Sequence, residues 1–211
     1  YEIPYKQKYS GPETFYVEGD WSAAAFWLCA GAIGKNAVTV SGLNLRSSQG
    51  DRQIVDILKV FGAEVDEEGD SVTAYPSQLH GADIDLAAIP DLGPVIALLG
   101  CAAYGKTRLL NAGRLRLKES DRLKAIAENL KLLGGKVREK KDGLLIKGMS
   151  GAKFVGGEVS SFNDHRIVMM EAVASLISYG KVSIQGKEAV DKSYPGFFRV
   201  METAGLADNV V

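Results

Sequence analysis

The sequence predicts an α+β (mixed α/β) fold built from three repeats of about 70 residues. Apolar residues show helical spacing in some segments and strand-like patterns in the short segments between them, so helices and strands alternate along the chain. Two sets of glycines recur with similar spacing: Gly62, Gly134 and Gly205, which are 72 and 71 residues apart, and Gly34, Gly105 and Gly180, which are 71 and 75 residues apart. Two landmarks with one period indicate an internal structural repeat.

The first repeat (19–79) starts with a helix that Asp20 or Ser22 can cap and that is apolar on every side, so we expect it to be buried. A strand at 37–41 follows. The apolar stripe between Ile54 and Phe61 predicts a second helix with one face on the core, and segments 63–65 and 72–75 predict a hairpin.

The second repeat (80–150) has the same order of predicted elements. An apolar helix starts near Pro94, a strand covers 107–110, and a striped helix covers 123–133. Asp142-Gly143 is a good turn signal for the hairpin that follows.

The third repeat (151–211) is predicted to be incomplete. A helix at about 166–177, a strand at 182–184 and a last helix begun by Pro195 follow the same order, but no hairpin follows them. We therefore expect the domain to lack a strand that another part of a longer polypeptide would add.

The charge balance excludes some classes of protein. The chain has 25 Lys and Arg residues against 26 Asp and Glu residues, which argues against a broad nucleic-acid or anionic-membrane surface. No apolar run is long enough to span a bilayer, and no His, Cys, Asp and Glu cluster has metal-ligand spacing. We expect a cytoplasmic protein with no nucleic-acid, membrane or metal partner, and with any anion site in a local pocket.

Charged residues gather where the predicted helices begin. Cations are unusual there, because the helix dipole favours anions at an N-terminus and disfavours Lys and Arg. The charged residues are Asp91, Lys118, Glu119, Arg122, His165, Arg166 and Lys192. If the repeats are related by pseudo-symmetry, these helix ends point the same way and the cations converge on one face.

The residue types suit anion binding and proton transfer. Arg122 and Arg166 suit bidentate recognition of carboxylate or phosphate, whereas Lys118 and Lys192 supply compact charges. Arg114 and Arg116 lie in the same charged stretch of sequence, but their residue types and spacing assign them no role in the site.

Carboxylates among so many cations, Asp91 and Glu119, are the acid/base candidates. Spacing alone leaves plainer interpretations open. The run around Glu119 can be a capping run with Ser120 as the cap, Asp91 can be a cap or turn residue, and His165 can be structural.

At these residues the sequence resembles the 5-enolpyruvylshikimate-3-phosphate synthase (3-phosphoshikimate 1-carboxyvinyltransferase) family. Six motifs in order, over nearly the whole chain, carry the resemblance. They are Val17-Glu18-Gly19-Asp20-Trp21-Ser22, Gln49-Gly50-Asp51, Ile89-Pro90-Asp91, Leu117-Lys118-Glu119-Ser120-Asp121-Arg122-Leu123, Asn163-Asp164-His165-Arg166 and Asp191-Lys192-Ser193-Tyr194-Pro195. The resemblance implies a fold of two similar domains, each an "inside-out barrel" of three βαβαββ units, with helix N-termini facing the cleft between them.

The resemblance also implies a reaction, the transfer of the enolpyruvyl group from phosphoenolpyruvate to the 5-hydroxyl of shikimate 3-phosphate, with release of phosphate, in aromatic amino acid biosynthesis. It implies that Asp91 is the base at that hydroxyl, that Glu119 protonates the methylene carbon and that Lys118 contacts the 3-phosphate. The phosphoenolpyruvate clamp would be Arg122, Arg166 and Lys192, with His165 beside them. This chemistry requires no metal, and we expect no cofactor.

The chain corresponds to only the C-terminal half of that family's polypeptide. We expect residues 1–18 to be the end of the missing domain or a hinge, and residues 19–211 to be one domain whose partner is the missing N-terminal half. Alone it should be inactive. Two alternatives are a UDP-N-acetylglucosamine enolpyruvyl transferase, which has the same fold, and a non-catalytic anion-binding domain.

Overall fold

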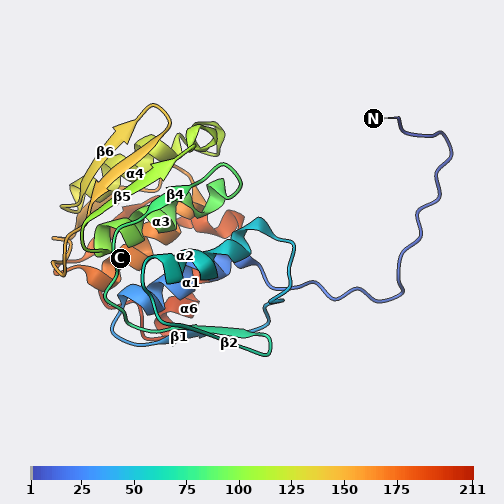
Figure 1. Cartoon of the computed structure of the whole chain (residues 1–211), viewed down its shortest axis with the longest axis horizontal. Helices are drawn as coiled ribbons and strands as arrows, with labels where there is room; N and C mark the ends of the chain where they lie inside the picture. Colours follow the sequence, from blue (N-terminus) through green and yellow to red (C-terminus); the bar gives the residue numbers. More distant parts are fainter. Residues whose placement is uncertain (1) are drawn as a thin grey trace.

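Three apolar helices lie side by side at the centre of the part that the structure, a computed structural model, describes, which is residues 2–211 (Figure 1). They are α1 (Trp21–Ile33), α3 (Gly93–Ala102) and α5 (His165–Ala174), and each contacts the other two. Their side chains are buried on almost every side, which explains the continuous apolar sequence of α1 and α3. The thiols of Cys29 and Cys101 are fully buried there, and burial raises the pKa of both, that of Cys101 to about 12.

Residues 2–211 form three sheets that cover these helices. The first is antiparallel, in the order β1-β3-β2: β1 (Val38–Val40), β2 (Val65–Glu68) and β3 (Ser71–Ala74). The second has the order β4-β5-β7-β6: β4 (Asp83–Asp85), β5 (Lys106–Leu110), β6 (Lys136–Lys140) and β7 (Gly143–Lys147). The third is a parallel pair, β8 (Gly157–Ser160) and β9 (Val182–Gln185).

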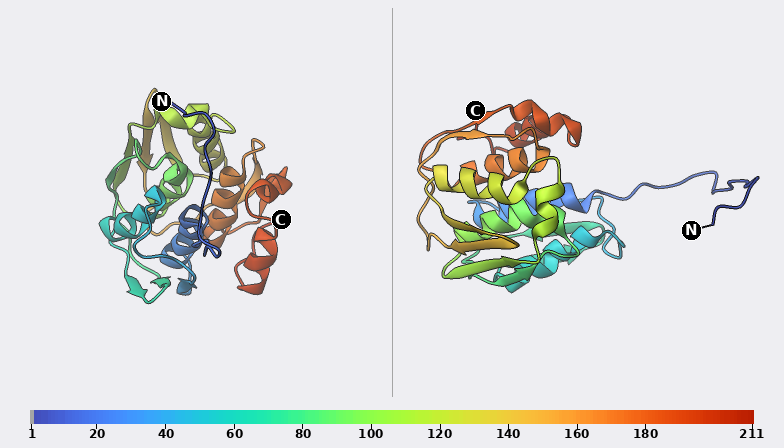
Figure 2. Two further views of the ribbon diagram at one scale, coloured as in Figure 1. Left: turned by 90° about the vertical axis from the view of Figure 1, so that its right-hand side faces the viewer. Right: turned by 90° about the horizontal axis from the view of Figure 1, so that it is seen from above.

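Further helices connect these layers (Figure 2). The α-helices are α2 (Ile54–Val60), α4 (Arg122–Leu132) and α6 (Phe197–Thr203). The 3₁₀ helices are η1 (Gly50–Gln53), η2 (Pro90–Leu92), η3 (Gly113–Leu117), η4 (Ser175–Ile177) and η5 (Lys187–Lys192). No helix within residues 2–211 is both long and apolar enough to cross a membrane.

The mixed α/β class predicted from the sequence is confirmed, and the predicted helices and hairpins are present with small shifts at their ends. The predicted helix at 166–177 is α5 followed by η4. The residue pattern does not reveal β4 and β8, because each strand has a single buried residue, Ile84 in β4 and Val159 in β8.

Two helix caps differ in how well the sequence defined them. Asp20 caps α1, accepting from the amides of Ser22 (2.8 Å) and Ala23 (3.3 Å). Asp121, and not Ser120, caps α4, because its carboxylate accepts from the Lys124 amide at 3.1 Å.

The C-terminal residues lie along the edge of β9. Val210 pairs with Val182 in a parallel bridge, and the Ile184 amide donates to the Val211 carbonyl at 3.1 Å. No hairpin follows α6 within the described residues. In the other two sheets, β1 and β5 have antiparallel partners, β3 and β7.

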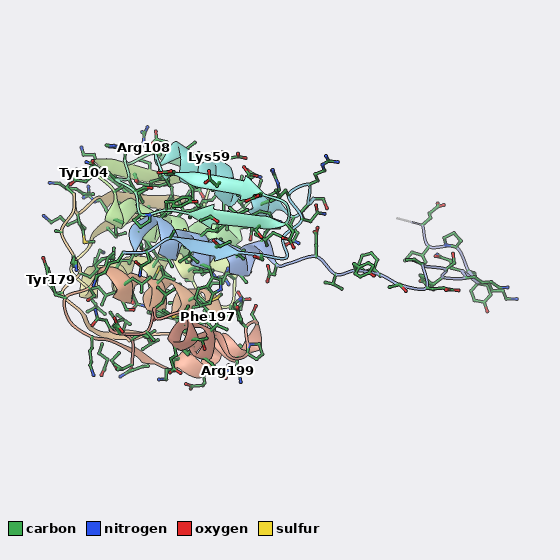
Figure 3. All side chains as sticks on the ribbon, turned by 90° about the horizontal axis from the view of Figure 1, so that it is seen from below. Lys59, Tyr104, Arg108, Tyr179, Phe197 and Arg199 are labelled. Atoms are coloured by element: carbon green, nitrogen blue, oxygen red, sulfur yellow. The ribbon has the colours of Figure 1, made fainter. Side chains whose placement is uncertain are left out.

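The N-terminal segment runs out from this body (Figures 1 and 3). Residues 2–17 are exposed, including the side chains of Tyr5, Tyr9 and Tyr16. Contact with the body begins at Glu18 and Gly19, whose amide donates to the Gly42 carbonyl at 3.0 Å.

Candidate active site

The N-termini of α3, α4 and α5 meet at one buried arginine. Arg122, the first residue of α4, has no exposed surface. Its Nε donates to Asp164 Oδ2 (2.7 Å), its Nη1 to Asp91 Oδ1 (2.7 Å), and its Nη2 to Glu119 Oε2 (2.6 Å) and Asp164 Oδ1 (3.1 Å). Because Asp164 caps α5 and Asp91 lies just before α3, one guanidinium joins three helix starts.

Asp164 is the fully buried partner of this arginine. Its carboxylate also accepts from the Ser120 hydroxyl (2.9 Å) and the Arg166 amide (3.0 Å). Burial would raise the pKa of Asp164, but the hydrogen bonds and charge of Arg122 outweigh it and hold the pKa below its ordinary value. The sequence pattern indicates no role for Asp164, although this residue lies inside the Asn163–Arg166 motif.

Asp91 lies among three cations. Its Oδ1 is 2.9 Å from Lys118 Nζ, 2.7 Å from Arg122 Nη1 and 3.7 Å from Arg166 Nε. Partial burial would raise the pKa of Asp91, yet Lys118, Arg166 and Arg122 together hold it below its ordinary value. The carboxylate is therefore ionised at neutral pH and accepts hydrogen bonds.

Two polar atoms beside this cluster are buried without a hydrogen-bond partner in the described residues, His165 Nδ1 and Arg166 Nη1. Burial, and next the positive charge of Arg166, lower the pKa of His165, so its imidazole is neutral at pH 7. An unsatisfied guanidinium nitrogen is costly to bury, which suggests a group positioned for an anionic ligand.

Lys192, at the end of η5, connects to the start of α5. Its Nζ donates to the backbone carbonyl of Asn163 (2.8 Å) and to the Asn163 side-chain oxygen (2.5 Å). Lys192 is exposed, and Asn163 directly precedes the Asp164 cap.

A cavity of about 360 Å³ opens beside Asp91 and Lys118. The other residues that line it are Ser22, Gln49, Gly50, Asp51, Ala88, Pro90 and Arg114. Asp51 is nearly buried and accepts from the Ser22 hydroxyl, and burial raises its pKa. The N-terminus of α1 therefore also reaches this cavity.

The sequence analysis did not assign Ser22, Asp51 or Arg114 to the site. Ser22 and Asp51 could have been found from their position, because each belongs to one of the six motifs and lies at the start of a helix. For Arg114 the only such signal is its location in the charged stretch that forms η3. Its Nη1 donates to the Ala87 carbonyl at 3.3 Å.

A larger hollow, about 540 Å³, lies between the C-terminal ends of α1 and α3. Lys35, Lys153 and Tyr104 line it, but no carboxylate does. It therefore offers no acid/base pair, and the smaller cavity at the helix N-termini is the better candidate. No group of three or more His, Cys, Asp and Glu residues within residues 2–211 could hold a metal ion.

The structure thus places the seven residues predicted from the sequence at one end of the helices. Asp91, Lys118, Glu119, Arg122 and Arg166 are linked by ion pairs; His165 is next in sequence to the Asp164 cap, and Lys192 is bonded to Asn163.

Cations and ionised carboxylates at converging helix N-termini define the class of α/β domain whose site suits an anionic ligand and acid/base chemistry. The chain belongs to the EPSP synthase (3-phosphoshikimate 1-carboxyvinyltransferase) family, whose model matches residues 3–201.

Curated relatives agree with this membership. The 3-phosphoshikimate 1-carboxyvinyltransferase of Clostridium acetobutylicum is 46% identical over 199 residues, which cover 94% of this chain and 45% of that protein. The enzyme of the same name from Methanococcus maripaludis is 39% identical over 212 residues, which cover 100% of this chain and 49% of that protein. The chain therefore spans about half the length of the curated relatives it matches.

Solved structures show the same fold. An EPSP synthase from Acinetobacter baumannii superimposes with a TM-score of 0.81 at 31% identity, over 90% of this chain and 47% of that one. The enolpyruvyl transferase NikO from Streptomyces tendae superimposes with a TM-score of 0.72 at 21% identity, over 90% of this chain and 43% of that one, which shows a shared fold alone.

Proposed function

We propose that the chain is the C-terminal half of an EPSP synthase, which transfers the enolpyruvyl group of phosphoenolpyruvate to the 5-hydroxyl of shikimate 3-phosphate. The observation that carries this proposal is the cluster around Arg122, where one buried guanidinium holds two candidate acid/base carboxylates next to cations. The 5-hydroxyl oxygen bonds to C2 of phosphoenolpyruvate and loses its proton, and the methylene carbon gains one. Loss of phosphate and of a methyl proton then restores the double bond.

Asp91 is the proposed acceptor of the 5-hydroxyl proton. Its carboxylate is ionised and borders the cavity, as such a base requires. The cations that lower its pKa also make it a weaker base, so a substrate anion that draws Lys118 away from Asp91 would raise its basicity. Lys118 is the proposed contact to the 3-phosphate.

Glu119 is the proposed acid at the methylene carbon. Its side chain is about 45% exposed, and Arg122 holds one of its oxygens. The other oxygen forms no hydrogen bond within residues 2–211, and the partial exposure of the side chain supports a role at the open side of the cluster.

The proposed phosphoenolpyruvate clamp is Arg122, Arg166 and Lys192, with His165 beside them. Arg166 Nη1 is buried and has no hydrogen-bond partner within residues 2–211, so it can donate to a bound anion. Arg122 already makes four hydrogen bonds to carboxylates, so it can contact phosphoenolpyruvate only by giving up part of this set. Its main contribution in the free chain is to position Asp91 and Glu119.

We further propose that residues 19–211 form one domain of three repeats, about 19–79, 80–150 and 151–211, and that 1–18 are the end of another domain or a hinge. The order helix, strand, helix in each segment supports this, as do the strands β4 and β8 near the starts of the second and third. Within residues 2–211, the C-terminal residues alone cover the sheet edge of β9, and this edge is where a strand from the missing half would add.

Titration calorimetry of the 211-residue chain tests the site. We expect weak binding of shikimate 3-phosphate that Lys118→Ala reduces about tenfold, and weak binding of phosphoenolpyruvate that Lys192→Ala reduces similarly, because each loses a charge-assisted contact. Lys187→Ala, at an exposed lysine of η5, is the matched control. Binding that neither substitution weakens would contradict the proposed site.

Turnover tests the proposed activity. The chain alone should release negligible phosphate from the two substrates, because half of the cleft is missing. Adding the half of the Clostridium acetobutylicum enzyme that this chain does not match should restore phosphate release, and Glu119→Gln should then slow it at least about a hundredfold. Full activity of the isolated chain would overturn the division into halves.

The curated relatives named above are 3-phosphoshikimate 1-carboxyvinyltransferases, which favours this acceptor over the alternative of a UDP-N-acetylglucosamine enolpyruvyl transferase. Offering both acceptors to the complemented enzyme separates the two. A non-catalytic anion-binding domain would bind the substrates and give no turnover with any partner half.

A further inference from the structure

The outer face of the second sheet carries a row of cations that the proposed reaction does not use. In the antiparallel register, Lys106 of β5 lies directly opposite Lys147 of β7, and Lys147 lies directly opposite Lys136 of β6. Residues directly opposite each other point to the same face, with Cβ atoms about 5 Å apart. All three are exposed, so three ammonium groups stand side by side across three strands.

The next row on this face holds two arginines. Arg108, Leu145 and Arg138 are opposite one another in the same register. Arg108, on the outer surface in Figure 3, is paired with Asp83 of β4, whereas Arg138 forms no ion pair within residues 2–211. Leu145 is half-buried between the arginines and gives the surface an apolar spot.

Such a row has a cost, because like charges directly opposite each other in a sheet are destabilising. No ion pair within the described residues involves Lys106, Lys136 or Lys147. Protection of a sheet edge explains cations on β6, which is an edge strand. It does not explain Lys106 and Lys147, because β5 and β7 are paired on both sides.

The cations surround a hollow of about 300 Å³. The residues that line it include Lys106, Lys131, Lys136, Arg138, Leu145 and Lys147. Asp83 and Asp85 on β4 border the cationic area, which is therefore only three strands, or about 10 Å, wide. This width suits a small polyanion better than a long nucleic-acid strand.

We propose that this outer face of β5, β7 and β6 binds a short linear oligophosphate, such as inorganic tripolyphosphate or the triphosphate of a nucleotide. Lysine ammonium groups are well suited to phosphate oxygens as compact charges, and the flexible side chains of three neighbouring lysines can converge on consecutive phosphates. Leu145 offers an apolar contact to the base of a nucleotide. This site is independent of the candidate active site, which lies at the helix N-termini.

Titration calorimetry of the 211-residue chain with sodium tripolyphosphate, and in parallel with ATP, tests the proposal. We expect binding at low ionic strength that weakens as salt is added, because the charges are exposed. Lys147→Gln should reduce the affinity at least about fivefold, since it removes the central charge of the row. Lys187→Gln, which removes an exposed lysine elsewhere, should leave the affinity unchanged. Tighter binding of ATP than of tripolyphosphate would identify a nucleotide triphosphate as the ligand of this face.

The melting temperature of the ligand-free variants shows that they are folded. Lys147→Gln should melt at a higher temperature than the parent chain, because two like-charge contacts are relieved. A folded Lys147→Gln chain with unchanged affinity would overturn the proposal, as would the absence of binding. Binding that is lost in Lys192→Gln but kept in Lys147→Gln would place the anion at the candidate active site and overturn the proposal. Tighter binding of an RNA oligonucleotide than of tripolyphosphate would also overturn it, because the ligand would then be a nucleic acid.

Discussion

At the scale of single residues, two kinds of fully buried ionisable group stand out. Arg122 and Asp164 are buried but compensate each other through two hydrogen bonds. Glu171 is equally buried, in the middle of α5, and its Oε2 has no partner within residues 2–211. The first kind organises the candidate site, and the second weakens the fold.

Glu171→Gln should stabilise the chain at neutral pH. Burial raises the pKa of Glu171 well above its ordinary value, although a hydrogen bond from Asn129 opposes this. The folded state therefore prefers the protonated acid, and stability falls as pH rises from the unfolded pKa toward the folded one. Glutamine removes this loss, so the free energy of unfolding at pH 8 should rise by about 2 kcal/mol.

Urea unfolding at pH 5 and pH 8 measures this effect. The gain should shrink at pH 5, where Glu171 is more nearly protonated in both states. Glu128→Gln, at a more exposed glutamate on α4, is the control and should change stability little. A gain that is the same at both pH values would show that the charge of Glu171 is not the cause.

Arg122→Lys should destabilise the chain by about 3 kcal/mol, because an ammonium group has three donors on one nitrogen and cannot reproduce the four hydrogen bonds of the planar guanidinium, which leaves Asp164 poorly compensated. Because the pKa of Asp164 is lowered in the folded state, its ionisation stabilises the fold at pH values above the ordinary pKa of an aspartate. This stabilisation is lost as the pH falls through the pKa of the folded state. In the variant the folded pKa rises, so acid unfolding should begin at a higher pH. Circular dichroism during acid titration, with Arg138→Lys as an exposed control, checks this, and coincident curves would contradict it.

At the scale of elements, the sequence predicts those whose pattern is local and misses those defined by packing. The continuous apolar run of α1 and the Asp142-Gly143 turn are readable without a structure. β4 is not, because its pairing with β5 depends on residues more than twenty positions away. At the site, the motifs predict which residues gather, but the bond between Arg122 and Asp164 joins residues 42 apart and depends on how α4 meets α5.

Gly31 in α1 shows how packing can override helix propensity. Alanine normally stabilises a helix interior by about 1 kcal/mol relative to glycine. A Cβ at Gly31, however, would lie 2.5 Å from the Ala74 carbonyl oxygen and 3.0 Å from the Val38 amide nitrogen. Gly31→Ala should therefore lower the free energy of unfolding by about 2 kcal/mol, because α1 must move away from β1 and β3.

Thermal unfolding measures this change. Gly11→Ala, at an open position in the N-terminal segment, is the matched control and should leave the melting temperature unchanged. A Gly31→Ala chain that is more stable than the parent would show that α1 and the first sheet are not packed this closely.

At the scale of the whole molecule, the chain is a body with an exposed N-terminal segment. Because Tyr5, Tyr9, Phe15 and Tyr16 are exposed and the body begins at about Gly19, chymotrypsin should cut this segment before any site in the body under native conditions. Mass spectrometry should find a resistant fragment that begins after Tyr16. Early cleavage inside the body, after Phe61 or Phe154, which are fully buried, would contradict this organisation.

The two cysteines in the central helices supply a natural reporter. Cys29 in α1 and Cys101 in α3 have no exposed surface, and their raised pKa values keep both thiols protonated. A thiol-reactive dye can therefore label them only when the helices separate, and the labelling rate reports the free energy of that opening. The opening of the core can thus be followed in the chain and in each variant without adding a probe by mutation.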